Sequence, residues 1–288
     1  MTILRKSGQL DVLNYYKVVA PKLEKFLAGK ELATRIWLPG MGRPLLKRGS
    51  KEKPLYIEDL INGLTDEFLE TRVKLKKLDT ARGKLAPVQE LVWEYFYPRK
   101  LCDFFYATNR EGEGRNMDRI FYDIDRGNLP LASALEVARE LLAATKDKEF
   151  AELIGSHKRF VMYTGYSFHV YLLLKKEITP LFYDKYIHFT ENDPAASFTG
   201  RWAAKISEET KIKVIGGHEK QAGHINIDPS QTPSGKLARA PYSLHMKNAT
   251  TVDGVAIPVT EKELAEPDIL AKLKAYTPDK IVAEFRKK

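Results

Sequence analysis

Cysteine is almost absent from this chain: Cys102 is the only one among its 288 residues. An internal disulfide is therefore excluded, and so is a zinc site built from several cysteines. Apolar runs long enough to span a bilayer are also absent, and residues 1–13 do not contain the apolar core of a signal peptide. We therefore expect a cytoplasmic protein with no membrane partner.

Internal repeats and low-complexity tracts are also missing, which favours one compact domain over residues 1–288. The composition, 43% hydrophobic and 30% charged, is that of an ordinary globular protein. The net charge of +9 favours polyanionic partners such as nucleic acid, although a basic enzyme without such a partner has the same composition.

Apolar spacing predicts a mixed α and β fold. The predicted helices cover residues 10–27, 56–78, 86–97, 130–145, 180–188, 194–209 and 261–285. The predicted strands cover residues 118–125, 159–174 and 223–228, with an extended segment at 236–245. A strand, a helix and a strand follow one another from residue 118 to 174, so the strands are expected to be neighbours in one sheet.

The strand at 118–125 ends in two acids, Asp123 and Asp125, after the apolar run Ile120-Phe121-Tyr122. Alternate side chains of a strand share a face, so both carboxylates point the same way. Two acids at a strand end are more often a solvated turn. At the end of a buried strand, however, they cost free energy unless a cation compensates them.

Two further segments carry candidate site residues. Ser167 and His169 alternate with apolar residues, and Gly165 just before them allows close backbone approach to a phosphate. Asp228 follows the apolar Ile225 and Ile227 and opens a turn rich in Pro, Ser and Gly. A packed histidine and a surface turn are the ordinary alternatives at these two places.

Basic residues follow in the extended segment after Asp228. Arg239, His245 and Lys247 suit the oxygens of a triphosphate, although a basic edge strand has the same pattern. His218 and His224 lack an obvious third ligand for zinc. The cluster Tyr95, Tyr97, Phe104, Phe105 and Tyr106 indicates core or sheet aromatics rather than base-stacking platforms.

Taken together, three carboxylates and a histidine on strands suit two hard cations, Mg²⁺ or Mn²⁺, and a triphosphate. This combination is typical of nucleotidyl transfer. Asp123, Asp125 and Asp228 are the expected catalytic and metal-binding residues.

The three motifs in this order resemble the archaeo-eukaryotic primase superfamily, which has an acid-x-acid strand, a Ser-x-His strand and a later acid. The segment from Arg239 to Lys247 is similar to the Arg-x-Pro-x-Ser-Leu-His-x-Lys segment of archaeal primase small subunits. Residues 11–21 with 27–29, and residues 228–231 with 240–244, are similar instead to the polymerase domain of bacterial end-joining ligases. In that branch a nucleotide-contacting lysine stands at the position of Lys47.

Two departures from these families are visible. The second motif, Thr164-Gly165-Tyr166-Ser167-Phe168-His169, is shorter than the usual Ser-Gly-x-x-Gly-x-His form. Gln9 stands where the end-joining branch tends to carry a lysine for a downstream 5′-phosphate.

The resemblance implies an α+β fold: a primase-polymerase catalytic core of mixed and antiparallel sheets flanked by helices, with an RRM-like unit. Residues 1–115 would form an N-terminal part, 116–260 the motif-bearing core and 261–288 a C-terminal helical part of one catalytic domain. His169, Arg239, His245, Lys247 and Lys47 would bind the nucleotide, with Ser167 and the backbone near Gly165.

The implied activity is a DNA primase or primase-polymerase that adds nucleotides from NTPs or dNTPs on a single-stranded or primed DNA template, in replication or repair. A gap-filling, end-joining polymerase is the nearest alternative. A non-catalytic nucleic-acid-binding accessory subunit and a metal-dependent nuclease are the others. An accessory replication or repair subunit is a possible partner.

Overall fold

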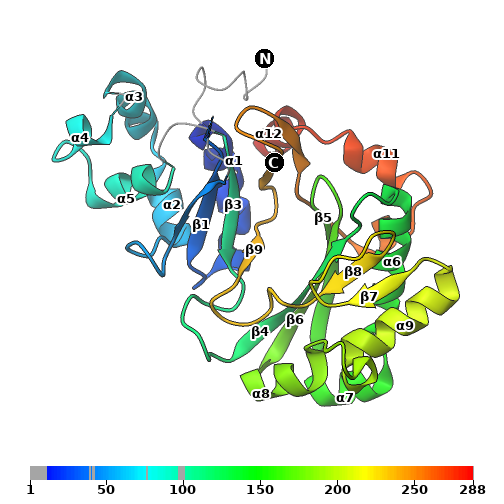
Figure 1. Cartoon of the computed structure of the whole chain (residues 1–288). Helices are drawn as coiled ribbons and strands as arrows, with labels where there is room; N and C mark the ends of the chain where they lie inside the picture. The colour runs from blue at the N-terminus through cyan, green and yellow to red at the C-terminus, as the bar shows by residue number, and fades with distance from the viewer. Residues whose placement is uncertain (1–11, 39, 41–42, 76, 97–100, 288) are drawn as a thin grey trace. The chain divides into compact units, whose positions relative to one another are not determined.

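The computed structural model describes residues 12–38, 40, 43–75, 77–96 and 101–287 (Figure 1). Within it the chain forms two compact units. Unit 1 consists of Met1–Ala107, Arg239–Ala256 and Ala275–Lys288, and unit 2 of Thr108–Ala238 and Ile257–Lys274. The single catalytic domain over 1–288 stays a prediction, and part of its expected core, 239–256, belongs to unit 1.

Unit 1 is built on a four-stranded sheet in the order β2-β1-β3-β9. These strands are β1 (Leu32–Ile36), β2 (Leu45–Arg48), β3 (Cys102–Ala107) and β9 (Leu237–Arg239), whose last residue enters unit 1. Helix α1 (Leu13–Leu27) covers one face, where the Tyr16 ring lies 5.2 Å from the Phe104 ring. Because side chains alternate along β3, Asp103 and Phe105 lie on the other face.

Short helices and a hairpin complete unit 1. The helical segment predicted at 56–78 is interrupted at Thr65, whose Oγ1 accepts the Phe68 N–H at 3.1 Å, and a further short helix begins at Leu78. The helices are α2 (Ile57–Gly63), α3 (Asp66–Leu75), α4 (Leu78–Ala81), α5 (Pro87–Tyr95) and α12 (Pro278–Arg286). The hairpin strands are β10 (Leu244–Met246) and β11 (Val252–Val255).

Unit 2 contains a six-stranded sheet in the order β12-β5-β6-β4-β8-β7. The strands are β4 (Met117–Asp125), β5 (His157–Tyr163), β6 (Phe168–Ile178), β7 (Val214–Gly216), β8 (Ile225–Asp228) and β12 (Ile257–Val259). Neighbours are antiparallel except β7 and β8, which are parallel. The three motif strands are therefore adjacent, as expected, in the order β6-β4-β8.

Two long helices cross over this sheet. Helix α6 (Leu131–Ala144) connects β4 to β5, and α9 (Phe198–Thr210) lies between β6 and β8 in the chain. This pair of split βαβ units confirms the predicted mixed α+β class and its RRM-like part. The helices pack on the face that carries Tyr122, whose ring lies 6.1 Å from that of Trp202. Asp123 and Asp125 lie on the opposite face.

The remaining helices are α7 (Lys148–Ile154), α8 (Pro180–Phe182), the π-helix η1 (Tyr183–Ile187), the 3-10 helix η2 (Pro194–Ala196), α10 (Glu261–Leu264) and α11 (Ile269–Lys274). None of the helices in the described ranges combines the length and apolar composition needed to cross a bilayer. Gln9, Tyr97 and the predicted helix start at residues 10–11 lie outside the described residues.

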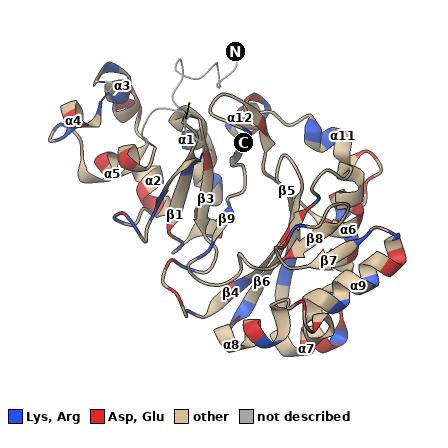
Figure 2. Ribbon diagram, in the orientation of Figure 1, with Lys and Arg blue, Asp and Glu red and all other residues tan. Residues whose placement is uncertain are grey.

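Two predicted strands prove to be interrupted. The strand expected at 159–174 is the β5–β6 hairpin, because Gly165 adopts φ +92° and the Thr164 N–H donates to the Ser167 carbonyl at 2.9 Å. The extended segment at 236–245 turns at Tyr242, whose φ is +60°, and so becomes β9 and β10. Lys and Arg, blue in Figure 2, are spread over elements of both units rather than gathered on one.

Candidate active site

Three predicted site residues form a row across the unit 2 sheet. In the antiparallel ladders Asp123 of β4 is opposite His169 of β6 on one side and Asp228 of β8 on the other. Residues directly opposite in such a pair hold their Cβ atoms about 4.5–5.5 Å apart and on one face. Asp125, two residues beyond Asp123, shares that face. The structure thus brings the three carboxylates together on the face that α6 and α9 leave open.

His169 is held against this acid row. Its Nε2 lies 3.4 Å from Oδ1 of Asp123, and its side chain is 10% exposed against 41% for Asp123. The Phe121 ring packs edge-on at 4.7 Å from the imidazole. These contacts place a nitrogen that can carry a proton beside a solvent-accessible carboxylate.

A lysine that sequence reasoning missed contacts the second acid. The Lys220 ammonium lies 2.5 Å from Oδ2 of Asp125. Burial alone would raise the pKa of Asp125, but the hydrogen bond and charge of Lys220 and the Gly127 N–H outweigh it and hold that pKa below its usual value. The hydrogen bond to Asp125 in turn raises the pKa of Lys220.

Asn226 explains how Lys220 is presented. On β8 it is opposite Asp125 and two residues before Asp228. Its Nδ2 donates to the carbonyls of Gly217 at 3.1 Å and Glu219 at 2.7 Å, which fixes the loop between β7 and β8. The sequence does show a polar residue, Asn226, between the apolar Ile225 and Ile227 of this strand. It does not show which loop carbonyls the Asn226 side chain binds.

The carboxylate of Asp228 is oriented by the turn that follows it. Oδ1 accepts the Ser230 N–H at 2.8 Å, and Oδ2 accepts the Ser230 hydroxyl at 2.9 Å. Nearby, the Tyr183 hydroxyl donates to the Pro229 carbonyl at 3.3 Å. Burial, and then the charge of Asp228, raise the pKa of Tyr183, which keeps the phenol neutral.

Thr232 and Asn109 fasten this turn to β4. The Thr232 hydroxyl accepts the Phe121 N–H at 2.9 Å and donates to the Phe121 carbonyl at 2.8 Å. Asn109 donates to the Thr232 and Arg119 carbonyls and accepts the Asp118 and Arg119 N–H groups. Asp228 therefore lies between two anchors, the β8 ladder and the Thr232 contact. Sequence reasoning missed both anchoring residues.

Ser167 has a structural partner in the hairpin turn. It is 4% exposed, and its hydroxyl donates to the Ile124 carbonyl. Gly165 adopts its left-handed conformation in the same turn, and its carbonyl accepts the Tyr163 hydroxyl at 3.0 Å. The expected phosphate contacts of Ser167 and Gly165 stay predictions.

The acid row fits a hard divalent cation by its donor chemistry, three carboxylates on one open face. Lys220 already places a positive charge on one of them. Within the described residues, no group of three His, Cys, Asp or Glu side chains is arranged closely enough to hold a metal ion.

Arg239 of unit 1 is buried against Asp103, an acid that the sequence did not mark as a site residue. Its Nη1 lies 2.6 Å from Oδ1 of Asp103 and 2.7 Å from the Leu244 carbonyl. The other carboxylate oxygen, Oδ2, accepts Arg35 Nε at 2.8 Å, and the Met246 N–H donates to Oδ1 at 2.9 Å. The triphosphate contact of Arg239 stays a prediction, while the structure shows its role in the fold.

The other cationic candidates of unit 1 are more accessible. His245 is partly exposed on β10 and Lys247, just beyond it, is exposed, while Leu244 and Met246 are buried. The alternation puts His245 and Lys247 on one side, as expected for an extended chain. The Lys47 ammonium lies 2.7 Å from Oε1 of Glu52, and both side chains are partly exposed.

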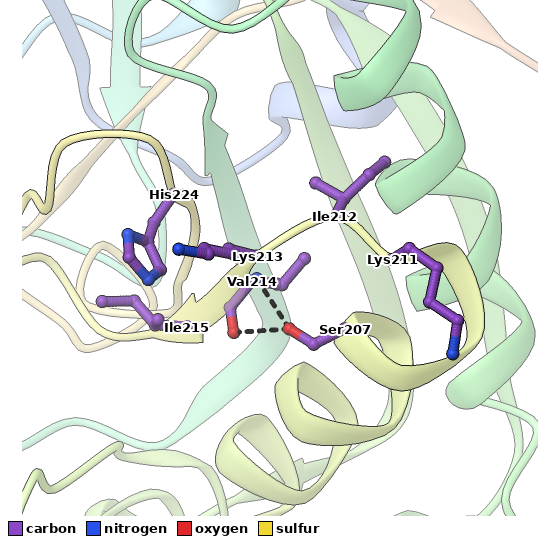
Figure 3. A pocket seen from close by; sticks show the side chains of 7 residues that line it. All are labelled: Ser207, Lys211, Ile212, Lys213, Val214, Ile215 and His224. Atoms are coloured by element: carbon purple, nitrogen blue, oxygen red, sulfur yellow. Dashed lines mark hydrogen bonds between the residues drawn. The ribbon is translucent and has the colours of Figure 1, made fainter.

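Unit 2 also has a small open pocket of about 200 Å³. Its lining residues, drawn in Figure 3, are Ser207, Lys211, Ile212, Lys213, Val214, Ile215 and His224. The Ser207 hydroxyl accepts the Val214 N–H at 2.7 Å and donates to its carbonyl at 3.0 Å, which closes the outer edge of β7. The pocket holds none of the predicted catalytic residues and is smaller than most small-molecule sites.

No family model matches the chain. It is 22% identical over 266 residues to the multifunctional non-homologous end joining protein LigD of Mycolicibacterium smegmatis. That alignment covers 90% of this chain but only 30% of the relative's length. The fold is similar to the polymerase domain of Mycobacterium tuberculosis ligase D in complex with DNA, with a TM-score of 0.56 and 17% identity. This match covers 96% of this chain and 88% of that one.

These comparisons confirm the resemblance to the polymerase domain of bacterial end-joining ligases. The fold is shared over nearly the whole chain, and the sequence likeness spans the same region.

Proposed function

We propose that this chain is a template-directed nucleotidyltransferase acting on DNA, of the primase-polymerase kind. The observation that carries the proposal is the row of His169, Asp123 and Asp228 across three adjacent strands, with Asp125 on the same open face. The likeness to a polymerase domain in complex with DNA supports a DNA substrate.

In this proposal Asp123, Asp125 and Asp228 would hold divalent metal, Mg²⁺ or Mn²⁺. When bound, such ions supply charge stabilisation for the transferring phosphate and acidify the attacking hydroxyl. Both oxygens of Asp228 accept hydrogen bonds from Ser230, which restrains the orientation of the carboxylate. His169 positions Asp123 and donates a hydrogen bond to a phosphate oxygen when protonated.

The triphosphate would be bound by cationic side chains of unit 1, with His245 and Lys247 as the main contacts and Lys47 as a further one. Their partial exposure leaves them accessible to a ligand, in contrast to Arg239. We propose that Arg239 acts through Asp103, which also binds the β10 backbone next to His245. The backbone at Gly165 would add a neutral donor near the acid row, and Ser167, whose hydroxyl donates to the Ile124 carbonyl, would hold the turn that carries it.

Two finer forms of this activity have separate support. The comparisons with ligase D proteins favour a gap-filling, end-joining polymerase. The segment from Arg239 to Lys247, similar to archaeal primase small subunits, favours de novo priming. A non-catalytic accessory subunit would have no need of three carboxylates on one face. A cytoplasmic location fits each form.

The decisive assay compares two substrates in the presence of labelled nucleotides and Mn²⁺. Extension of a primer, with preference for short gaps bearing a 5′-phosphate, would support the repair polymerase. New labelled oligomers on an unprimed single strand would support the primase. Absence of both products would contradict the proposed function.

The residue test is Asp123→Ala, which removes the central carboxylate of the row. Incorporation should fall to background, while the circular dichroism spectrum and melting temperature stay near those of the wild type, because Asp123 is 41% exposed. Asp193→Ala, at an exposed position of the same unit, is the matched control and should retain full activity. Incorporation by the Asp123→Ala protein would refute the assignment.

A further inference from the structure

The face of the unit 1 sheet opposite α1 carries a cluster of aromatic rings and arginines, of which the proposed chemistry uses only Arg239. Phe105 of β3 is partly exposed, whereas its neighbours Phe104 and Tyr106 are fully buried. The expectation of core or sheet aromatics is confirmed for Phe104 and Tyr106, which lie in the core, and for Phe105, which lies in a strand. Trp37, directly after β1, is also partly exposed.

Cationic groups lie against these rings. The Arg35 guanidinium carbon is 5.0 Å from the centroid of Phe105 and 5.7 Å from that of Trp37. The Arg239 guanidinium carbon is 4.9 Å from the Phe105 centroid. Each distance is within the range of about 6 Å at which a cation is attracted to an aromatic face.

A buried acid holds this cluster in place. Asp103 is 0% exposed and accepts four donors: Arg35 Nε, Arg239 Nη1, the Met246 N–H and the Trp37 Nε1 at 3.3 Å. The rings and guanidinium groups are thus fixed before any ligand arrives, which lowers the entropic cost of binding.

Arginines meet the rings on this face. Arg35 and Arg239 both contact the single carboxylate of Asp103, and Arg48 of β2 lies on the same face, because Ala33 is opposite Arg48 on one side and Phe105 on the other. Partly exposed aromatic rings beside arginines are the combination by which proteins bind unpaired bases and their phosphates.

We propose that Phe105 and Trp37, together with the Arg35 guanidinium, form a base-stacking surface for single-stranded nucleic acid. The ligand chemistry is a nucleobase with an adjacent phosphate. Phe105 supplies the stacking ring, and Arg35 supplies both a second planar group and charge for the phosphate. Binding at this surface requires neither a divalent metal nor the acid row.

Tryptophan fluorescence gives a direct readout. The chain has three tryptophans, of which Trp93 is 0% and Trp202 4% exposed. Titration of the full chain in EDTA with a short oligothymidylate should quench Trp37 and leave the buried pair unchanged. The Trp37→Phe protein should lose this signal, and an abasic oligonucleotide of equal length should not produce it. Quenching by a nucleoside triphosphate but not by the oligonucleotide would identify a free nucleotide as the ligand and overturn the strand assignment.

The stacking residue is tested by Phe105→Leu, with binding followed by anisotropy of a labelled oligonucleotide. Loss of one stacked base should weaken binding by between about 5-fold and 150-fold without altering the salt dependence, because no charge is removed. Arg35→Gln should instead flatten the salt dependence. Phe105→Tyr keeps a ring and should bind like the wild type.

The matched control is Phe182→Leu, the same substitution at a partly exposed ring of unit 2. It should leave binding unchanged. Wild-type affinity in Phe105→Leu, or an equal loss in Phe182→Leu, would refute the stacking surface. The Asp123→Ala protein should still bind, so failure of catalysis and failure of this surface are told apart.

Discussion

Replacing Asp103 by asparagine should destabilise unit 1 strongly. The change keeps the shape of the side chain but removes the charge that Arg35 and Arg239 share. Removing one partner of a buried ion pair costs about 3–5 kcal/mol. Arg239 is 6% exposed and cannot regain water, whereas Arg35 is 29% exposed and recovers part of its hydration. We therefore expect a loss near the lower end, about 3 kcal/mol.

Urea unfolding followed by tryptophan emission measures this loss. In a Trp202→Phe background the remaining tryptophans, Trp37 and Trp93, both belong to unit 1. The matched control is Glu52→Gln, which breaks the partly exposed pair with Lys47 and should cost about 0–1 kcal/mol. Equal losses in Asp103→Asn and Glu52→Gln would refute the reasoning.

The same variant has a distinct pH signature. Burial alone would raise the pKa of Asp103, but Arg239 and Arg35 outweigh it and hold the pKa below its ordinary value. A carboxyl whose pKa is lowered by folding contributes stability above its unfolded pKa of about 3.9, and that stability is lost as pH falls through the folded pKa. The stability gap between wild type and Asp103→Asn should be constant from pH 7 to about pH 5 and shrink below about pH 4.

Three further predictions concern unit 2. Thr232→Val leaves the buried Phe121 N–H without its acceptor, so it should lower the free energy of unfolding by about 1–3 kcal/mol and reduce the turnover number. Urea unfolding and primer extension measure these two effects, and unchanged values would exclude the anchoring role of Thr232. Lys220→Gln removes an ammonium group from a side chain that is 75% exposed, so the free energy of unfolding should change by less than about 1 kcal/mol. Mn²⁺ should bind more tightly in electron paramagnetic resonance titrations, because the ammonium no longer competes with the cation for Asp125. Equal Mn²⁺ affinity would show that it does not compete. Lys211→Gly should stabilise the chain by about 0.5–1 kcal/mol, because the residue at the end of α9 has φ +60°, while Lys211→Ala should give no gain in the same thermal melts.

The positions of the acids in the fold were predictable from local pattern. Asp123 and Asp125 end an apolar strand, and Asp228 ends another, so alternation alone assigns each carboxylate to the polar face. The order of the three motifs along the chain is the order found in the archaeo-eukaryotic primase superfamily, and the strand, helix and strand from residue 118 to 174 predicted that motif strands are neighbours. The structure agrees, since β4 is flanked by β6 and β8.

Contacts that depend on turns were not predictable in this way. Lys220 reaches Asp125 because Asn226 binds two carbonyls of the preceding loop, a conformation that no spacing in the sequence encodes. Thr232 binds Phe121 from a turn whose composition indicates only a surface loop. These contacts follow from strand register and loop closure, which are properties of the folded sheet.

Arg239 shows why a basic residue in a motif is weak evidence of ligand contact. Its partner Asp103 is 136 residues earlier in the chain, so the pairing depends on the packing of β3 beside β9. An arginine bound to a fully buried carboxylate has little free energy to gain from a phosphate, because its charge is already compensated. The same segment leaves His245 and Lys247 accessible. His245, Lys247 and Arg35, which shares Asp103 but remains partly open to solvent, are therefore better placed than Arg239 to contact a ligand.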